Sequence, residues 1–202
     1  MVIGITGGVG AGKSYVMEYL HSCYGVFVIL ADDVARQLQM PGQRVYHKMV
    51  ELLGEECLSE NGELNRNYVA QKMFQEEALR LQINNIVHPE VKQEIITLIS
   101  EAQKQYQHIA VEAALLIEEQ YDEICDELWY VDAADEIRIE RLAQARGYSK
   151  EKSLDIMKNQ LPREMFQLHC QRVIDNSGSK EDLKHQLDEI FKKQLDDEEI
   201  IK

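Results

Sequence analysis

The sequence predicts an α/β protein with a central parallel sheet of five strands and helices on both faces. Three observations predict this fold. Short apolar runs alternate with amphipathic helical patterns along the chain. The first apolar run is followed by a glycine-rich loop and then by a helical pattern, in the order strand, loop, helix. The 202 residues, of which 45% are hydrophobic and 29% charged, match the ordinary composition of one globular domain.

The predicted strands are separated by helical patterns, so we expect parallel pairing through right-handed crossovers. The strands cover residues 2–6, 26–30, 108–111, 128–131 and 172–174. The helix after the first strand is expected to run from Lys13 to about Tyr24, with Gly25 as its C-cap. The last helix is expected to start at Ser179, where Asp182 completes a capping box.

Residues 43–107 lack strand patterns, which predicts an inserted helical substrate domain between the second and third strands. Within it, Pro89 suits the first turn of a helix and disfavours a helical conformation at His88. We therefore expect a junction between two helices there, and a substrate-facing His88 imidazole is the alternative. Residues 135–168 are helical and charged and are expected to form a lid. The predicted organisation is a single domain over 1–202, with a core of about 1–42, 108–134 and 169–202, an insert of about 43–107 and a lid of about 135–168.

Charge and composition exclude several classes of protein. A net charge of −14 opposes general binding to nucleic acid, whose phosphates attract Lys and Arg. The apolar runs are too short to span a membrane, and the first residues lack the basic segment of a secretion signal. We therefore expect a cytoplasmic protein, a monomer or weak homo-oligomer. The cysteines lack zinc or redox spacing and are expected to be reduced structural thiols: Cys23, Cys57, Cys125 and Cys170.

The segment Gly7–Ser14 reads GGVGAGKS and fits the phosphate-binding pattern G-x-x-x-x-G-K-[ST]. Its glycines allow the backbone to wrap a phosphate, and its N–H groups and the helix N-terminus face an anion. Lys13 is expected to reach the β- and γ-phosphates and Ser14 to hold Mg²⁺. The dinucleotide pattern G-x-G-x-x-G fails, because its third glycine would fall on Lys13 or Tyr15. The sequence therefore predicts a three-layer P-loop NTPase fold. The expected cofactors are ATP and Mg²⁺.

Two groups of acidic residues follow predicted strands. Asp32 and Asp33 come directly after the second strand, where ligands of doubly wound sheets bind. One of these carboxylates could accept a proton from an attacking hydroxyl, or either could cap the following helix. Glu112 ends the third strand and could orient the metal or its water, or it could be a partly exposed carboxylate.

Three arginines belong to one helical pattern of the predicted lid: Arg138, Arg141 and Arg146. They could neutralise a transferring phosphoryl group, or they could pair with nearby acidic side chains. Arg146 precedes Gly147, and this mobile helix end would suit lid closure.

These pieces together resemble the dephospho-CoA kinase family over nearly the whole chain. The resemblance is carried by an ordered set of segments, Ile5–Ser14, Ala31–Arg36, Pro41–Gly42, Gly62–Arg66, His88–Pro89, Leu115–Glu118, Arg141–Leu142 and Val173–Asn176. It implies transfer of the γ-phosphoryl of ATP to the ribose 3′-hydroxyl of dephospho-CoA, the final step of coenzyme A synthesis. The rivals are another P-loop kinase of small metabolites and a slowly hydrolysing nucleotide switch. The chain has no Asn-Lys-x-Asp motif of GTP switches.

The resemblance also implies roles for individual residues. The catalytic set is Asp32, as the base, with Lys13 and Arg141. The nucleotide-binding set is Gly8, Gly10, Ala11, Gly12, Lys13, Ser14, Tyr15, Arg141, Arg146 and Asn176, with Ser14 on the metal. The acceptor-binding set is Asp32, Arg36, Arg66 and His88.

The chain departs from the family pattern at four positions: Leu30 replaces an aspartate, Ala114 a proline and Tyr15 a small residue, and Arg146 is offset by about one residue.

Overall fold

The computed structural model describes the backbone of residues 1–200 and the side chains of residues 1–192. It divides into two compact units. The first unit comprises Met1–Val28 and Gln105–Lys202, and the second comprises Ile29–Lys104. The second unit contains most of the segment for which the sequence predicts an inserted helical domain, although the domain boundaries remain a prediction.

The five predicted strands form one parallel sheet, which confirms the predicted fold class. The strands are β1 (Val2–Thr6), β2 (Phe27–Leu30), β3 (Ile109–Glu112), β4 (Glu127–Asp132) and β5 (Arg172–Asp175). Their spatial order is β2-β3-β1-β4-β5. In the central ladders Ile3 pairs with Ala110 of β3 and with Glu127 of β4. All five residues of β1 are buried, as expected for the middle of a parallel sheet.

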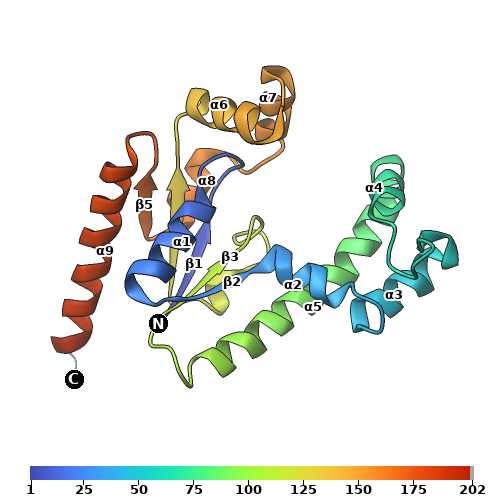
Figure 1. The fold of residues 1–202 in the computed structure, drawn as a ribbon, viewed down its shortest axis with the longest axis horizontal. Helices are drawn as coiled ribbons and strands as arrows, with labels where there is room; N and C mark the ends of the chain where they lie inside the picture. Colours follow the sequence, from blue (N-terminus) through green and yellow to red (C-terminus); the bar gives the residue numbers. More distant parts are fainter. Residues whose placement is uncertain (201–202) are drawn as a thin grey trace. The chain divides into compact units, whose positions relative to one another are not determined.

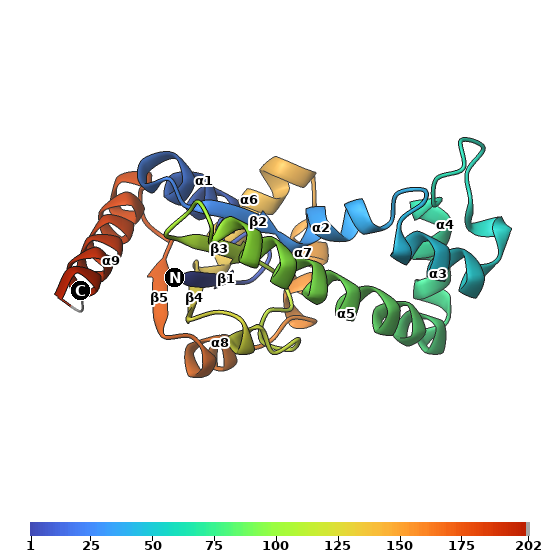
Figure 2. The ribbon, with the colours of Figure 1, turned by 90° about the horizontal axis from the view of Figure 1, so that it is seen from below.

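The helices of the first unit cover both faces of this sheet, and Figure 2 shows α1 and α8 on opposite sides of it. They are α1 (Lys13–Tyr24), α6 (Asp135–Arg146), α7 (Lys150–Lys158), α8 (Arg163–His169) and α9 (Lys180–Ile200), with a 3-10 turn η2 (Tyr121–Glu123) (Figure 1). On the α8 side, Tyr130 of β4 stacks on Phe166 with ring centroids 4.7 Å apart. On the α1 side, the ring of Tyr24 packs against the ring of Phe191 of α9, with ring centroids 4.4 Å apart. These aromatic contacts attach α8 to the sheet and α9 to α1.

Both predicted helix ends of the first unit are confirmed. Gly25 ends α1 with a left-handed φ of 65°, and its N–H donates to the His21 carbonyl at 3.0 Å. At the start of α9, Ser179 Oγ accepts from the Asp182 N–H at 3.1 Å, and Asp182 Oδ2 accepts from the Ser179 N–H at 3.0 Å. This reciprocal pair is the expected capping box.

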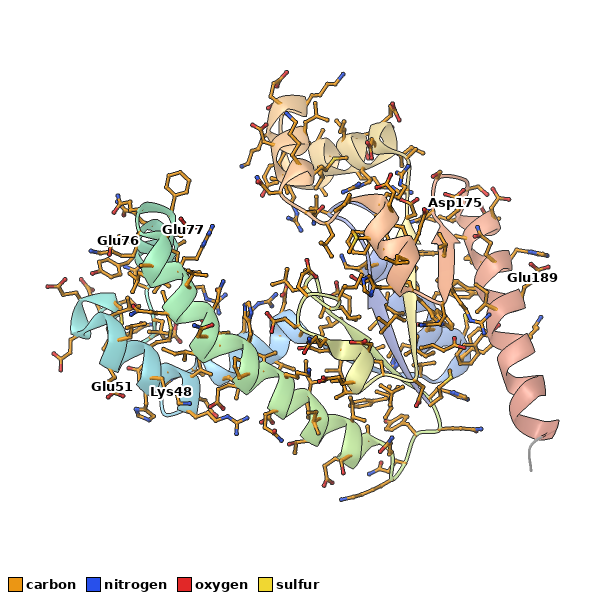
Figure 3. All side chains as sticks on the ribbon, turned by 180° about the vertical axis from the view of Figure 1, so that it is seen from behind. Lys48, Glu51, Glu76, Glu77, Asp175 and Glu189 are labelled. Carbon is orange, nitrogen blue, oxygen red and sulfur yellow. The ribbon has the colours of Figure 1, made fainter. Side chains whose placement is uncertain are left out.

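The second unit is helical, with three helices packed on the long helix α5. Its elements are α2 (Ala31–Leu38), α3 (Arg44–Leu53), the 3-10 turn η1 (Glu55–Cys57), α4 (Arg66–Gln75) and α5 (Glu77–Ala102). Ion pairs join α3 to α5. Arg44 NH2 lies 2.7 Å from Glu94 Oε2, and Lys48 Nζ lies 2.6 Å from Glu90 Oε1. Figure 3 labels Lys48 on α3.

The predicted helix junction at His88 and Pro89 is wrong, because α5 continues through both residues. A proline inside a helix loses one backbone hydrogen bond and costs about 3 kcal/mol. Burial of apolar side chains on both sides of the proline, among them Ile83, Val91 and Ile95, offsets that cost, since each contributes about 1.5–3 kcal/mol. The local rule on proline is therefore overridden by packing.

None of the four cysteines forms a disulfide in the structure. Cys57 and Cys170 are buried, Cys125 is partly buried and Cys23 is exposed. Burial raises the pKa of the Cys170 thiol to about 11, so this side chain behaves as an uncharged packing residue. Among the helices of the described residues, none combines the length and apolarity needed to cross a membrane.

Candidate active site

The predicted phosphate-binding segment forms a loop between β1 and α1. Gly10 and Gly12 have left-handed φ angles of 78° and 96°, and Gly12 is the N-cap of α1. The N–H groups of Lys13 and Ser14, in the first turn of the helix, have no acceptor within it. They stand at the positive end of the helix dipole. The loop and helix start thus form an anion-binding site with the donors that a polyphosphate requires.

Glycines in this loop are also required by the residues packed behind it. A Cβ at Gly8 would overlap the guanidinium of Arg138, and a Cβ at Gly12 would overlap the side-chain amide of Asn176. Both partners lie far along the chain, after β4 and β5. The loop is therefore shaped by side chains of the first unit as well as by its own sequence.

Lys13 is held inside the loop by two oxygen atoms. Its Nζ donates to the Gly7 carbonyl at 2.8 Å and lies 3.4 Å from Glu112 Oε1 at the end of β3. The Lys13 and Glu112 side chains are only 14% and 18% exposed. Glu112 therefore has a defined position beside the predicted phosphate-binding lysine, which differs from an ordinary exposed carboxylate.

The oxygen ligands available at this loop suit Mg²⁺. Mg²⁺ prefers carboxylate, hydroxyl and phosphate oxygens and retains several waters, so it needs few protein ligands. Ser14 is exposed at the first turn of α1, and Glu112 lies beside Lys13. Among the described residues there is no cluster of three His, Cys, Asp or Glu side chains, and a metal shared with phosphates requires none.

Arg141 and Asn176 are brought together at the far side of the loop. Arg141 NH2 donates to the Asn176 carbonyl at 2.9 Å, and Arg141 NH1 donates to the Ala11 carbonyl at 3.3 Å. The buried Asn176 side chain donates to the same Ala11 oxygen at 2.7 Å. Tyr15, the next residue after Ser14, has the Lys180 ammonium 5.3 Å from its ring centroid. The predicted nucleotide-binding residues thus converge, with one exception.

That exception is Arg146, which the structure places apart from the loop. It is exposed at the end of α6, and its guanidinium lies 6.0 Å from the ring centroid of Tyr148. Arg146 follows Arg141 by five residues, which is about 7.5 Å along a helix.

Two residues outside the predicted site contact the loop. Arg138 Nε donates to the Val9 carbonyl at 2.9 Å, and Gln160 Oε1 accepts from the Val9 N–H at 3.0 Å. The helical pattern identified Arg138 only as one arginine of three. No spacing or motif identified Gln160. The sequence indicated only that it lies within the predicted lid.

The four predicted acceptor-binding residues all belong to the second unit. Asp32 and Arg36 lie four residues apart on α2, so they share a helix face, and both are exposed. Arg66 is the first residue of α4 and is exposed, while His88 is half-buried in α5. The first unit therefore carries the predicted nucleotide residues and the second unit the predicted acceptor residues.

The interpretation of Asp32 or Asp33 as a helix cap is wrong. Helix α2 starts at Ala31, its N-cap is Leu30, and the cap makes no side-chain hydrogen bond. Both aspartates lie within the first turn, where the helix dipole favours negative charge. Asp33 pairs with Arg36 at 2.6 Å, which leaves Asp32 as the carboxylate available for another partner.

Comparison with known proteins identifies the same family along the whole chain. The family model described as Dephospho-CoA kinase matches residues 1–182. The dephospho-CoA kinase of Idiomarina loihiensis is 32% identical over 194 residues, which cover 96% of this chain and 95% of that protein. The crystal structure of TT1252 from Thermus thermophilus is 28% identical, has a TM-score of 0.80 and covers 96% of this chain and 97% of its own. The dephospho-CoA kinase structure from Campylobacter jejuni is 19% identical, covers 95% of both chains and has a TM-score of 0.72, which shows the shared fold.

Proposed function

Because the chain belongs to the dephospho-CoA kinase family, we propose that it transfers the γ-phosphoryl of ATP to the ribose 3′-hydroxyl of dephospho-CoA. The products are coenzyme A and ADP, and the reaction is the final step of coenzyme A synthesis. The observation that carries the proposal is the extent of the family match. Residues 1–182 include both the phosphate loop of the first unit and the acceptor residues of the second.

The nucleotide is proposed to bind across the phosphate loop. Backbone N–H groups at the start of α1 and the Lys13 ammonium would hold the β- and γ-phosphates. Ser14 and Glu112 would hold Mg²⁺ and its waters, and the metal when bound neutralises charge on the phosphate oxygens. Arg141 and Asn176 would contact the nucleotide, which their hydrogen bonds to the Ala11 carbonyl support. Arg146 would join them only if the lid moves.

The acceptor is proposed to bind to the second unit through Arg36, Arg66 and His88. Asp32 would take the proton of the 3′-hydroxyl as that oxygen bonds to the γ-phosphorus. The bond from the γ-phosphorus to the bridging oxygen of ADP then breaks, and ADP leaves with the electron pair. Arg141 would offset the negative charge of the transferring group. We further propose a cytoplasmic location, no nucleic-acid partner and a monomer or weak homo-oligomer.

The first test measures ADP release with and without dephospho-CoA, followed by mass analysis of the product. Acceptor-dependent release and a gain of one phosphate on dephospho-CoA are expected. A nucleotide switch would instead release ADP slowly whether or not the acceptor is present. A panel of nucleoside monophosphates would reveal another small-metabolite kinase.

The second test separates Asp32 from its neighbour. Asp32→Asn should bind ATP normally and lose about 100-fold or more in turnover, because general-base catalysis contributes that much. The matched control is Asp33→Asn, which removes the same charge one residue away and should leave turnover nearly unchanged while affecting the acceptor KM at most. Near-normal turnover of Asp32→Asn would remove Asp32 from the role of base.

A further inference from the structure

We infer that Gln160 is a positioning residue of the phosphate loop, because it holds the Val9 peptide together with Arg138 and so links the lid to the binding of ATP phosphates. The kinetic test of this inference rests on the proposed function, because it measures phosphorylation of dephospho-CoA. The binding test requires only that the protein binds ATP. The three residues Val9, Arg138 and Gln160 are called the Val9 clamp below.

The Val9 clamp satisfies both polar groups of one loop residue. The Val9 N–H donates to Gln160 Oε1 at 3.0 Å, and the Val9 carbonyl accepts from Arg138 Nε at 2.9 Å. Arg138 NH2 closes the ring by donating to Gln160 Oε1 at 3.1 Å. Val9 lies between Gly8 and Gly10, where the backbone is otherwise free to adopt several conformations. The clamp therefore fixes the loop between these two glycines.

The chemistry of the clamp identifies which atom of Gln160 is needed. The Val9 N–H and the Arg138 guanidinium are both donors, and both point at one side-chain atom. That atom must be the carbonyl oxygen, because the amide nitrogen offers only donors. A carboxylate could replace this oxygen, and a methionine of similar size could not.

Arg138 is committed to this role rather than to a phosphate. Its side chain is 10% exposed, and its NH1 lies 3.4 Å from Asp135 Oδ1. A charged group with so little exposure requires partners for its donors, and the clamp and Asp135 provide them. The missing Cβ of Gly8 leaves the space that the guanidinium occupies. Moving Arg138 onto a phosphate would leave the Val9 carbonyl without this donor.

The clamp also connects the loop to the lid. Gln160 follows α7 by two residues, and a cavity of about 370 Å³ beside it is lined by Gly8 and by lid residues such as Leu154 and Met157. In this region Arg138 and Gln160 of the predicted lid make polar contacts with Val9 of the loop. A displacement of α7 that carries Gln160 away would therefore break its bond to the Val9 N–H and loosen the donors that receive the phosphates.

The test compares three variants of Gln160 by calorimetric titration with ATP and Mg²⁺. Gln160→Met removes the side-chain oxygen. Gln160→Asn keeps an amide oxygen, but the side chain is one methylene shorter and does not reach Val9. Each should raise the Kd for ATP about 10-fold, which is about 1.4 kcal/mol, because the Val9 N–H and the Arg138 guanidinium lose the acceptor that they share. Gln160→Glu restores the acceptor and should stay within about threefold of the wild type. The matched control is Gln144→Met on α6, where the amide contacts exposed Glu140 and binding should not change.

Steady-state kinetics then distinguish positioning from general loss of structure. Gln160→Met and Gln160→Asn should raise the KM for ATP and leave the KM for dephospho-CoA unchanged, with melting temperatures near that of the wild type. The inference is overturned if both bind ATP as the wild type does, or if Gln160→Glu is as weak as Gln160→Met. If one variant fails to fold, the other two still decide. A wild type that binds ATP but does not phosphorylate dephospho-CoA would refute the proposed function and leave the binding test intact.

Discussion

Asn176 donates its side-chain Nδ2 to the carbonyl oxygen of Ala11 at 2.7 Å, although the two residues are 165 positions apart in the chain. The backbone N–H of Asn176 donates to the Asp132 carbonyl at 2.7 Å, which fixes the turn after β5 to the end of β4. The residue that follows edge strand β5 thereby supports the phosphate loop at the residue before Gly12. Asn176 is 7% exposed, so its side-chain amide requires a hydrogen-bond partner such as the Ala11 carbonyl.

The first prediction concerns this bond. Asn176→Ala should weaken ATP binding about 10-fold, because loss of a buried donor leaves the Ala11 carbonyl only the longer bond from Arg141. Asn176→Asp should be weaker still, because it places an oxygen against that carbonyl. Titration calorimetry with ATP measures both. The control is Asn159→Ala, whose amide contacts the exposed end of α7, and it should bind as the wild type does. Equal affinities of Asn176→Ala and wild type would contradict the prediction.

The second prediction concerns Glu112. Its carboxylate lies 3.4 Å from the Lys13 ammonium and is proposed to hold the metal or its water. Glu112→Gln removes the charge but keeps the shape, and Lys13 retains its bond to the Gly7 carbonyl. Turnover should fall about 10-fold or more and should require a higher Mg²⁺ concentration. Rates measured across a Mg²⁺ series test this, with exposed Glu140→Gln as the control. An unchanged Mg²⁺ dependence would exclude Glu112 from the metal site.

The sheet and the phosphate loop were predictable from the sequence because their signals are local. An apolar run, a glycine loop and a helical pattern follow one another within the first 24 residues, and β1 and α1 have their predicted bounds. The other strands start or end one residue from prediction, since ladder pairing with neighbours decides the last residue. Pro89 misled the prediction because burial of the flanking residues of α5 outweighs its local preference.

The candidate site was predictable only where a residue belongs to a motif or to the family pattern. Lys13, Arg141 and Asn176 do, and the structure brings them to one loop. Gln160 does not, because a single amide that contacts a backbone 151 residues away leaves no periodic or spacing signal. The helical pattern identified Arg138 as a candidate phosphate-binding residue. Whether its guanidinium binds a phosphate or the loop backbone depends on the burial of the side chain, which only the fold determines.

The third prediction concerns the ion pairs that join α3 to α5. Glu90 contacts both Lys48 and Arg44, and the hydrogen bond from Lys48, with the charge of Arg44, holds the pKa of its carboxyl below the usual range. The side chains of the two cations are 49% and 44% exposed, so Glu90→Gln should lower the free energy of unfolding by only about 1 kcal/mol. Urea unfolding measures the loss, which should shrink in high salt. Exposed Glu101→Gln is the control and should have a smaller effect. A loss that is independent of salt would show that packing, not charge, is responsible.

The fourth prediction concerns the attachment of α9 to α1 and its dependence on pH. Asp188 accepts hydrogen bonds from Tyr24 at 2.6 Å and from Tyr19 at 2.8 Å, and these donors lower the pKa of its carboxyl. A lowered pKa in the folded state contributes stability above the unfolded value, near 3.9, and loses it as the pH falls through the folded value. Asp188→Asn keeps an oxygen acceptor without the charge, so it should be about 1 kcal/mol less stable at pH 7. The difference from the wild type should shrink as the pH falls below about 4, as measured by urea unfolding across a pH series. Exposed Glu189→Gln, one residue along α9 (Figure 3), is the control. A difference that does not shrink as the pH falls would assign the effect to shape rather than to charge.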